Sequence, residues 1–214
     1  MFNVNFPNFF IKPPKLEKKS GVREVVLQQN VFAANKLEKW EGGEENSLKK
    51  QPKWDIKKFP LSYYTQDEPS KDFNKAVRTS IKTWSEASDG LMNFQRTFSA
   101  NDADIVIDWT DEKLASRDFE AGRNDLKVVN NRIEKAFVTI IINPKIDEGL
   151  SAKARIERVR RTALHEIGHA MGLNHSNNSQ DVMFHRGISN KNLSASDIKR
   201  LIEHYSNKNL DIMT

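Results

Sequence analysis

Two histidines and a glutamate near the end of a predicted helix have the spacing needed for metal chemistry. His165 and His169 are four residues apart, so their imidazoles project from one helical face and can bind the same ion. Glu166 lies about 100° around the helix from His165, too far round to bind the ion easily. It can still reach a water held by that ion. The spacing predicts a zinc site at which Glu166 is the general base.

A third histidine follows at the point where this helix must end. Gly172 stands where a left-handed C-terminal cap is expected, and a sharp turn there lets His175 approach the same ion. Three imidazoles leave zinc one open position, which is the arrangement of a catalytic rather than a structural site. His-Glu-x-x-His alone often occurs in ordinary helices. The added glycine and histidine distinguish this segment from a chance match.

The composition excludes several other kinds of site and limits the partners. The 214 residues include no cysteine, which rules out disulfides, thiolate metal ligands and cysteine nucleophiles. The 34 basic residues are scattered among 29 acidic ones, so the net charge of +5 does not predict nucleic-acid binding. No stretch approaches the roughly 18 apolar residues of a membrane span. The first residues lack the features of a signal peptide, which has either been trimmed or does not exist.

The elements that must position the site are predicted from periodicity. Five short strands rich in β-branched and aromatic residues are expected upstream of the motif, the third of them an interior strand. Asn130 and Asn131 should join the last two, because asparagine tolerates the positive φ of tight turns. These strands cover residues 59–64, 92–95, 103–109, 127–129 and 137–142.

Three helices are expected around these strands. The first follows Ser70 as its cap, ends at Asp89-Gly90 and has an apolar stripe of Phe73, Val77, Ile81 and Trp84. The second covers residues 151–171 and carries the metal motif. The third, over residues 193–205, begins with the capping pair Ser194 and Asp197. Its predicted buried stripe is Ile198, Leu201, Ile202 and Tyr205.

Residues 1–52 differ in composition from the rest and are predicted to be an N-terminal appendage, linker or prosegment, with residues 53–214 as the catalytic domain. The segment contains Pro13-Pro14, Gly42-Gly43 and several lysine runs. A solvated linker with no regulatory role is one interpretation. In the other, the segment inhibits the site, and a carboxylate takes the open zinc position. The carboxylates that could do so are Glu38, Glu41, Glu44 and Glu45.

The extended histidine motif, together with Met183 eight residues after His175, resembles the zinc motif and Met-turn of the metzincins. Ser176 directly follows the third histidine, and a serine at this position resembles the matrixin branch, that of the matrix metalloproteinases. Within that branch, the sequence resembles bacterial matrixin-like peptidases in particular. The resemblance covers residues 53–206. It implies an α+β catalytic domain with a twisted, mostly parallel five-stranded sheet that has an antiparallel edge strand. A packing helix, an active-site helix and a C-terminal helix complete the implied fold.

The resemblance implies a zinc-dependent metalloendopeptidase, a hydrolase that cleaves internal bonds of a protein or peptide through a zinc-bound water activated by Glu166. Met183 would form the hydrophobic floor beneath the zinc, although a lone methionine is more often core filler. The residues that resemble the substrate-pairing edge strand are Phe137, Val138, Thr139 and Ile140. We expect a monomer, located outside the cell or in the periplasm. A zinc-binding pseudopeptidase that serves as an interaction module is the rival interpretation, and the intact Glu166 argues against it.

Several departures from the matrixin pattern are visible. No histidine precedes His165, so the second, structural zinc of vertebrate matrixins is not expected, and the cysteine switch is impossible without cysteine. Asp147-Glu148 offers only a fragment of a calcium site, so calcium is possible but unsupported. Ser196 replaces the first of two adjacent acidic residues. His185 and His204 are expected not to be ligands, the latter near a helix C-terminus where positive charge is favoured.

Overall fold

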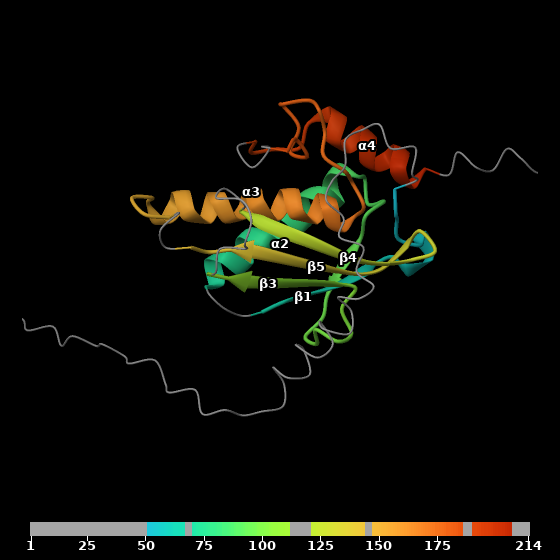
Figure 1. Cartoon of the computed structure of the whole chain (residues 1–214), viewed down its shortest axis with the longest axis horizontal. Coiled ribbons are helices and arrows are strands. Elements are labelled where there is room, and N and C mark those ends of the chain that lie inside the picture. Colours follow the sequence, from blue (N-terminus) through green and yellow to red (C-terminus); the bar gives the residue numbers. More distant parts are fainter. Residues whose placement is uncertain (1–50, 67–69, 112–120, 144–146, 186–189, 207–214) are drawn as a thin grey trace, which may run out of the picture. The chain divides into compact units, whose positions relative to one another are not determined.

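In the computed structural model, which describes residues 51–66, 70–111, 121–143, 147–185 and 190–206, five strands form one mixed sheet. The strands are β1 (Leu61–Thr65), β2 (Phe94–Arg96), β3 (Ile105–Thr110), β4 (Gly122–Val129) and β5 (Arg132–Ile141), and their order is β2-β1-β3-β5-β4. The pairs β1–β2, β1–β3 and β3–β5 are parallel, whereas β4 runs antiparallel to β5 (Figure 1). The predicted α+β class and the mostly parallel sheet with one antiparallel edge are confirmed.

The turn of the β4–β5 hairpin is as predicted, but the expected edge strand is wrong. Asn130 and Asn131 have φ values of 50° and 61°, the left-handed conformation of a tight hairpin turn. The segment Phe137–Ile140 was expected at the edge, yet it lies on β5, between β3 and β4. The edge strand is β4, because the hairpin folds it back onto the outer side of β5. The residues of this segment are alternately half-buried and buried, with none exposed, which suits an interior position.

Helix α2 (Lys71–Ala87) packs against the helix that carries the metal motif. The side chain of Ser70 accepts a hydrogen bond from the Phe73 amide, which confirms the predicted cap. At the other end, Asp89 and Gly90 take positive φ values of 51° and 76°, so the chain turns away where predicted. The Trp84 indole donates to the Leu164 carbonyl at 2.8 Å, which joins the two helices through the core.

Helix α3 (Ala152–Ala170) begins at its cap Ser151 and runs beside β4 and β5 (Figure 1). Its second half is buried on all sides, from Thr162 to Ala170. Gly172 follows with φ 86°, a conformation that L side chains rarely adopt. A side chain at Gly172 would also collide with the Pro52 carbonyl. Both the turn and the close approach therefore require glycine. Among the described residues, no helix is long and apolar enough to cross a membrane.

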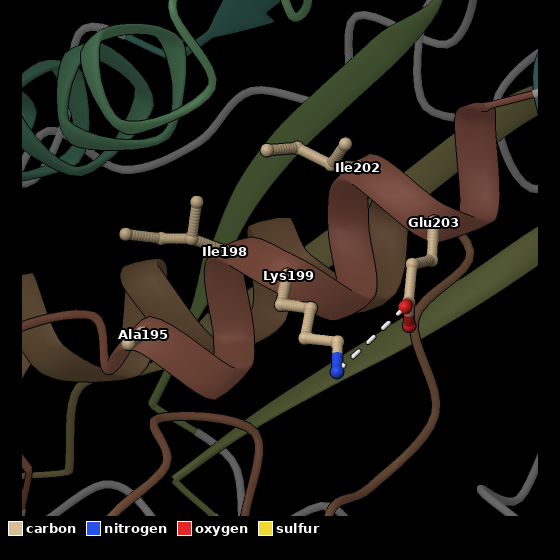
Figure 2. A pocket seen from close by; sticks show the side chains of 5 residues that line it. All are labelled: Ala195, Ile198, Lys199, Ile202 and Glu203. Carbon is tan, nitrogen blue, oxygen red and sulfur yellow. Dashed lines mark ion pairs between the residues drawn. The ribbon is translucent and has the colours of Figure 1, made fainter.

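Helix α4 (Ala195–Tyr205) has the predicted capping box but buries a different face from the one expected. Its buried residues are Asp197, Leu201 and Tyr205, whereas Ile202 is 40% exposed. The expected stripe is therefore wrong at Ile202, and Ile198 is only half-buried, because the buried face of the helix passes through Asp197, Leu201 and Tyr205. Figure 2 shows the outer face, a shallow surface groove lined by Ala195, Ile198, Lys199, Ile202 and Glu203.

The segment before β1 is part of the packed domain from residue 52 onward. Trp54 is only 1% exposed, and its indole donates to the Ala170 carbonyl at 2.8 Å. Tyr205 bridges the same region, accepting from the Trp54 amide and donating to the Met171 carbonyl. The predicted appendage, residues 1–52, lies outside the described residues except for 51 and 52. The four glutamates considered as inhibitory ligands lie outside them too.

His204 joins α4 to this segment as a neutral side chain. Its Nε2 lies 3.2 Å from the Pro52 carbonyl oxygen, which can only accept, so this nitrogen carries a proton and donates. Burial, with smaller effects from Lys53 and Arg200, lowers the pKa of His204 to about 4, although the hydrogen bond to Pro52 raises it. The expectation that His204 is favoured as a cation at the helix end is therefore wrong.

The variant His204→Gln should make folding stability less dependent on pH. The pKa of His204 is about 4 in the folded chain and about 6.5 in an unfolded one. The unfolded chain therefore binds more protons between these values, and stability falls as pH falls through that window. Glutamine can still donate a hydrogen bond but does not titrate.

Denaturant unfolding of the metal-free wild type and variant, at about pH 7 and about pH 5, checks this expectation. Acidification should cost the wild type ~1–2 kcal/mol more than the variant. Equal losses in the two proteins would show that His204 does not contribute to the pH dependence.

Candidate metal centre

The three histidines predicted as ligands converge on one point. His165 and His169 project from the end of α3, and His175 arrives from the loop after Gly172. The Nε2 atom of His169 lies 3.1 Å from Nε2 of His165 and 3.2 Å from Nε2 of His175. Among the described residues, this is the group of histidine and acidic side chains whose ligand atoms are close enough to share a metal ion.

Backbone carbonyls determine which nitrogen of each helical histidine faces the centre. Nδ1 of His165 lies 2.6 Å from the Val182 carbonyl oxygen, and Nδ1 of His169 lies 2.7 Å from that of Leu173. A carbonyl can only accept, so both Nδ1 atoms carry the proton and donate. Each Nε2 then presents a lone pair toward the other. Two lone pairs at this distance repel unless a cation lies between them.

The cation that suits this arrangement is a metal ion rather than a proton. Burial lowers the pKa of His165, and burial together with the neighbouring His165 and His175 lowers the pKa of His169 well below 6.5. Neutral imidazole, the form that binds metal, is therefore favoured. A tetrahedral zinc with Zn–N distances of about 2.0–2.1 Å places its nitrogen ligands about 3.3–3.4 Å apart. The observed separations are close to this value, so the donor set fits zinc.

Glu166 lies beside this centre but faces the sheet. It is 7% exposed, and its carboxylate is not one of the clustered ligand atoms. A Cβ atom placed on Gly122, the first residue of β4, would lie 2.8 Å from Cγ and 2.9 Å from Oε1 of Glu166. The side chain of Asn124 on the same strand reaches the Glu166 carbonyl at 3.4 Å. The carboxylate thus lies against the start of the edge strand.

Met183 is fully buried beneath the last turns of α3. Any side chain at Gly168 would collide with the Met183 sulfur, so this glycine allows the methionine to approach the helix. The backbone around Met183 is held by Asp197 of α4, which accepts from the Val182 and Met183 amides at 2.8 and 3.2 Å. Because the Val182 carbonyl accepts from His165, this segment also orients a histidine.

Sequence reasoning missed a further buried carboxylate, Asp181, in the loop between His175 and Met183. Its carboxylate accepts hydrogen bonds from the hydroxyls of Ser176, Ser194 and Ser196 at 2.5, 2.6 and 2.9 Å. Burial raises the pKa of Asp181, but these hydroxyls and the charge of Arg200 lower it below its usual value. The run of short polar residues after His175 could have indicated a hydrogen-bonded loop here, since such side chains often bond to nearby groups in turns.

The remaining predicted residues lie elsewhere. His185 is exposed and is not in the histidine cluster; its ring contacts that of Phe184, with centroids 4.2 Å apart and planes tilted by 53°. Asp147 is buried, and both its carboxylate oxygens accept from Arg158, at 2.7 and 2.9 Å. This ion pair leaves Asp147 poorly suited to a calcium ion, so calcium remains unsupported.

The family model described as matrixin matches residues 51–206, about three quarters of the chain. The matched region contains all the strands and helices described above, the histidine cluster and the Met183 segment. No curated protein gives a significant match to the sequence.

The variant His169→Ala should lose zinc. The other two histidines alone do not make a catalytic zinc site, because three protein ligands are needed to hold the ion. Metal analysis of the dialysed wild type should find one zinc per chain, and the variant should contain almost none. His185→Ala removes an exposed histidine outside the cluster, so this matched control should retain zinc. Full zinc content in His169→Ala would refute the assignment of the ligands.

Proposed function

The chain belongs to the matrixin family of metallopeptidases, and we propose that it is a zinc-dependent endopeptidase that hydrolyses internal bonds of proteins or peptides. The observation that carries the proposal is the convergence of three Nε2 atoms beside a buried glutamate. His165, His169 and His175 would hold the ion and Met183 would support them from below. A bound zinc supplies Lewis acidity toward the peptide carbonyl and lowers the pKa of water toward about 7.

Glu166 is the proposed general base. It is adjacent to His165 in sequence, and its carboxylate lies against Gly122 at the start of β4. From there it can accept a proton from the attacking water and return it to the leaving amine nitrogen. A zinc-binding module without catalysis would not need a carboxylate at this place. The position of Glu166 therefore supports an enzyme over an interaction domain.

The corrected sheet topology supports β4 as the strand that pairs with substrate. Within the described part of the sheet, β4 has β5 on one side and no strand on the other. An extended peptide can add to such an edge through main-chain hydrogen bonds. The strand runs from Gly122 to Val129, and its first residue contacts Glu166. A peptide bound along this edge would carry one of its internal bonds past the general base, as an endopeptidase requires.

We further propose that the catalytic domain begins near residue 51 and that residues before it form an appendage. The family match begins at residue 51, and the contacts of Pro52 and Trp54 with α3 and α4 support the same boundary. A monomer acting outside the cell or in the periplasm is the form that membership of this family favours.

The variant Glu166→Gln should keep its fold and zinc but lose activity. Glutamine preserves the size of the side chain and removes the proton acceptor, so kcat should fall by about 10²–10⁴. Peptide hydrolysis measured at matched zinc content checks this expectation. Turnover within a factor of a few of the wild type would exclude Glu166 as the base.

The variant Gly122→Ala should lower activity by displacing Glu166. The added methyl group would lie 2.8–2.9 Å from the Glu166 side chain and 2.8 Å from Cγ2 of Thr162 on α3, so the glutamate must shift. We expect the fold and zinc content to be retained and kcat to fall about tenfold or more, because small misplacements of catalytic groups are costly.

The same Gly122 substitution in a Glu166→Gln background provides the control. If crowding acts through Glu166, the second substitution should cause little further loss. Equal losses in the two backgrounds would show that Gly122 affects catalysis by another route.

A further inference from the structure

Arg200 on α4 reaches the backbone of the third histidine. Its Nη2 atom donates to the Asn174 carbonyl at 2.9 Å and to the His175 carbonyl at 3.1 Å. A guanidinium forms charge-assisted hydrogen bonds, which are stronger than neutral ones, and its planar shape restricts the orientation of the groups it binds. Arg200 therefore holds the two consecutive carbonyls on either side of the His175 Cα atom.

His175 depends on such contacts more than the other two histidines do. His165 and His169 are placed by the hydrogen-bonded backbone of α3, whereas His175 follows the helix-ending turn at Gly172. The position of its imidazole is set by the loop that carries it. The amide of Ser176 donates to the Met183 carbonyl at 2.7 Å and closes this loop on itself. The hydrogen bonds from Arg200 attach this loop to helix α4 as well.

Arg200 and Asp197 are three residues apart on α4, so they project from the same side of the helix. Asp197 accepts from the Val182 and Met183 amides at one end of the loop. Arg200 donates to the Asn174 and His175 carbonyls at the other end. The helix thus connects both ends of the segment on which the geometry of the cluster depends.

We propose that Arg200 is a positioning residue of the metal centre, which holds His175 where its Nε2 can share an ion with His165 and His169. The affinity for zinc is then set partly by α4, whose residues do not touch the metal. This inference rests on the proposed ligand set. Groups that orient a metal-binding histidine through hydrogen bonds, without touching the metal, typically contribute about 10–100-fold to metal affinity.

The neighbouring Lys199 is a matched control. Its ammonium lies on the outer face of α4, where it pairs with Glu203 at 3.9 Å (Figure 2). The Lys199 side chain is 74% exposed. Lys199→Met and Arg200→Met therefore remove the same charge from adjacent positions and keep an unbranched apolar stem. Only the second substitution removes the hydrogen bonds to the His175 loop.

The experiment measures zinc affinity of the full-length wild type and both variants by competition with a chelator. Arg200→Met should bind zinc about 10–100-fold more weakly than the wild type, and Lys199→Met should bind within about twofold of it. In the cobalt(II)-substituted proteins, Arg200→Met should also alter the visible absorption spectrum, because a displaced His175 changes the ligand field. A loss of thermal stability alone would not produce that change.

Unchanged zinc affinity and an unchanged cobalt spectrum in Arg200→Met would overturn the inference, as would an equal loss of affinity in Lys199→Met. If Arg200→Met does not fold, Arg200→Gln is measured by the same criteria, because glutamine stays polar but is too short to reach both carbonyls. His175→Ala tests the premise separately. Wild-type zinc affinity in that variant would refute the ligand set itself, whatever Arg200 does.

Discussion

The candidate metal centre depends on one electrostatic constraint. Three imidazole Nε2 atoms converge, and those of His165 and His169 carry lone pairs that repel unless a cation lies between them. Carbonyls of Val182 and Leu173 determine the tautomers of His165 and His169, so that both Nε2 atoms face inward as acceptors. Burial makes protonation unfavourable and favours a metal ion as the cation. The turn at Gly172 and the loop that returns to Met183 then serve to bring in the third nitrogen and hold it there.

Two close approaches of backbone to side chain allow this arrangement. Gly122 leaves room for the carboxylate of Glu166 against the edge strand, and Gly168 leaves room for Met183 under the helix. Neither position needs glycine for its backbone conformation, since neither has a positive φ. In both cases the glycine is explained by the atoms that pack on it. The proposed general base and the proposed substrate-pairing edge are thereby brought into contact.

Helix α4 shows how polar residues can support a site from outside. Asp197 faces inward, accepts from main-chain amides of the Met183 segment and is fully buried. Ser194 and Ser196 donate to Asp181, so the serine that replaces an expected acid has a partner of its own. Buried carboxylates without such donors would be strongly destabilising. The hydrogen bonds make this packing possible and couple the helix to the histidine loop.

The local features of this protein could be predicted from its sequence, because they depend on residues close together in the chain. The spacing of His165 and His169, the caps Ser70 and Ser194, and the Asn130-Asn131 turn each follow from local backbone geometry. Contacts between distant segments decided the rest. The edge strand is β4 rather than the expected β5, because strand order depends on how the hairpin folds back onto the sheet. Periodicity carries no information on that fold-back. The neutral state of His204, the inward rotation of Asp197 and the bonds of Arg200 to His175 likewise arose only in the folded chain, since burial and hydrogen-bond partners are properties of packing rather than of spacing.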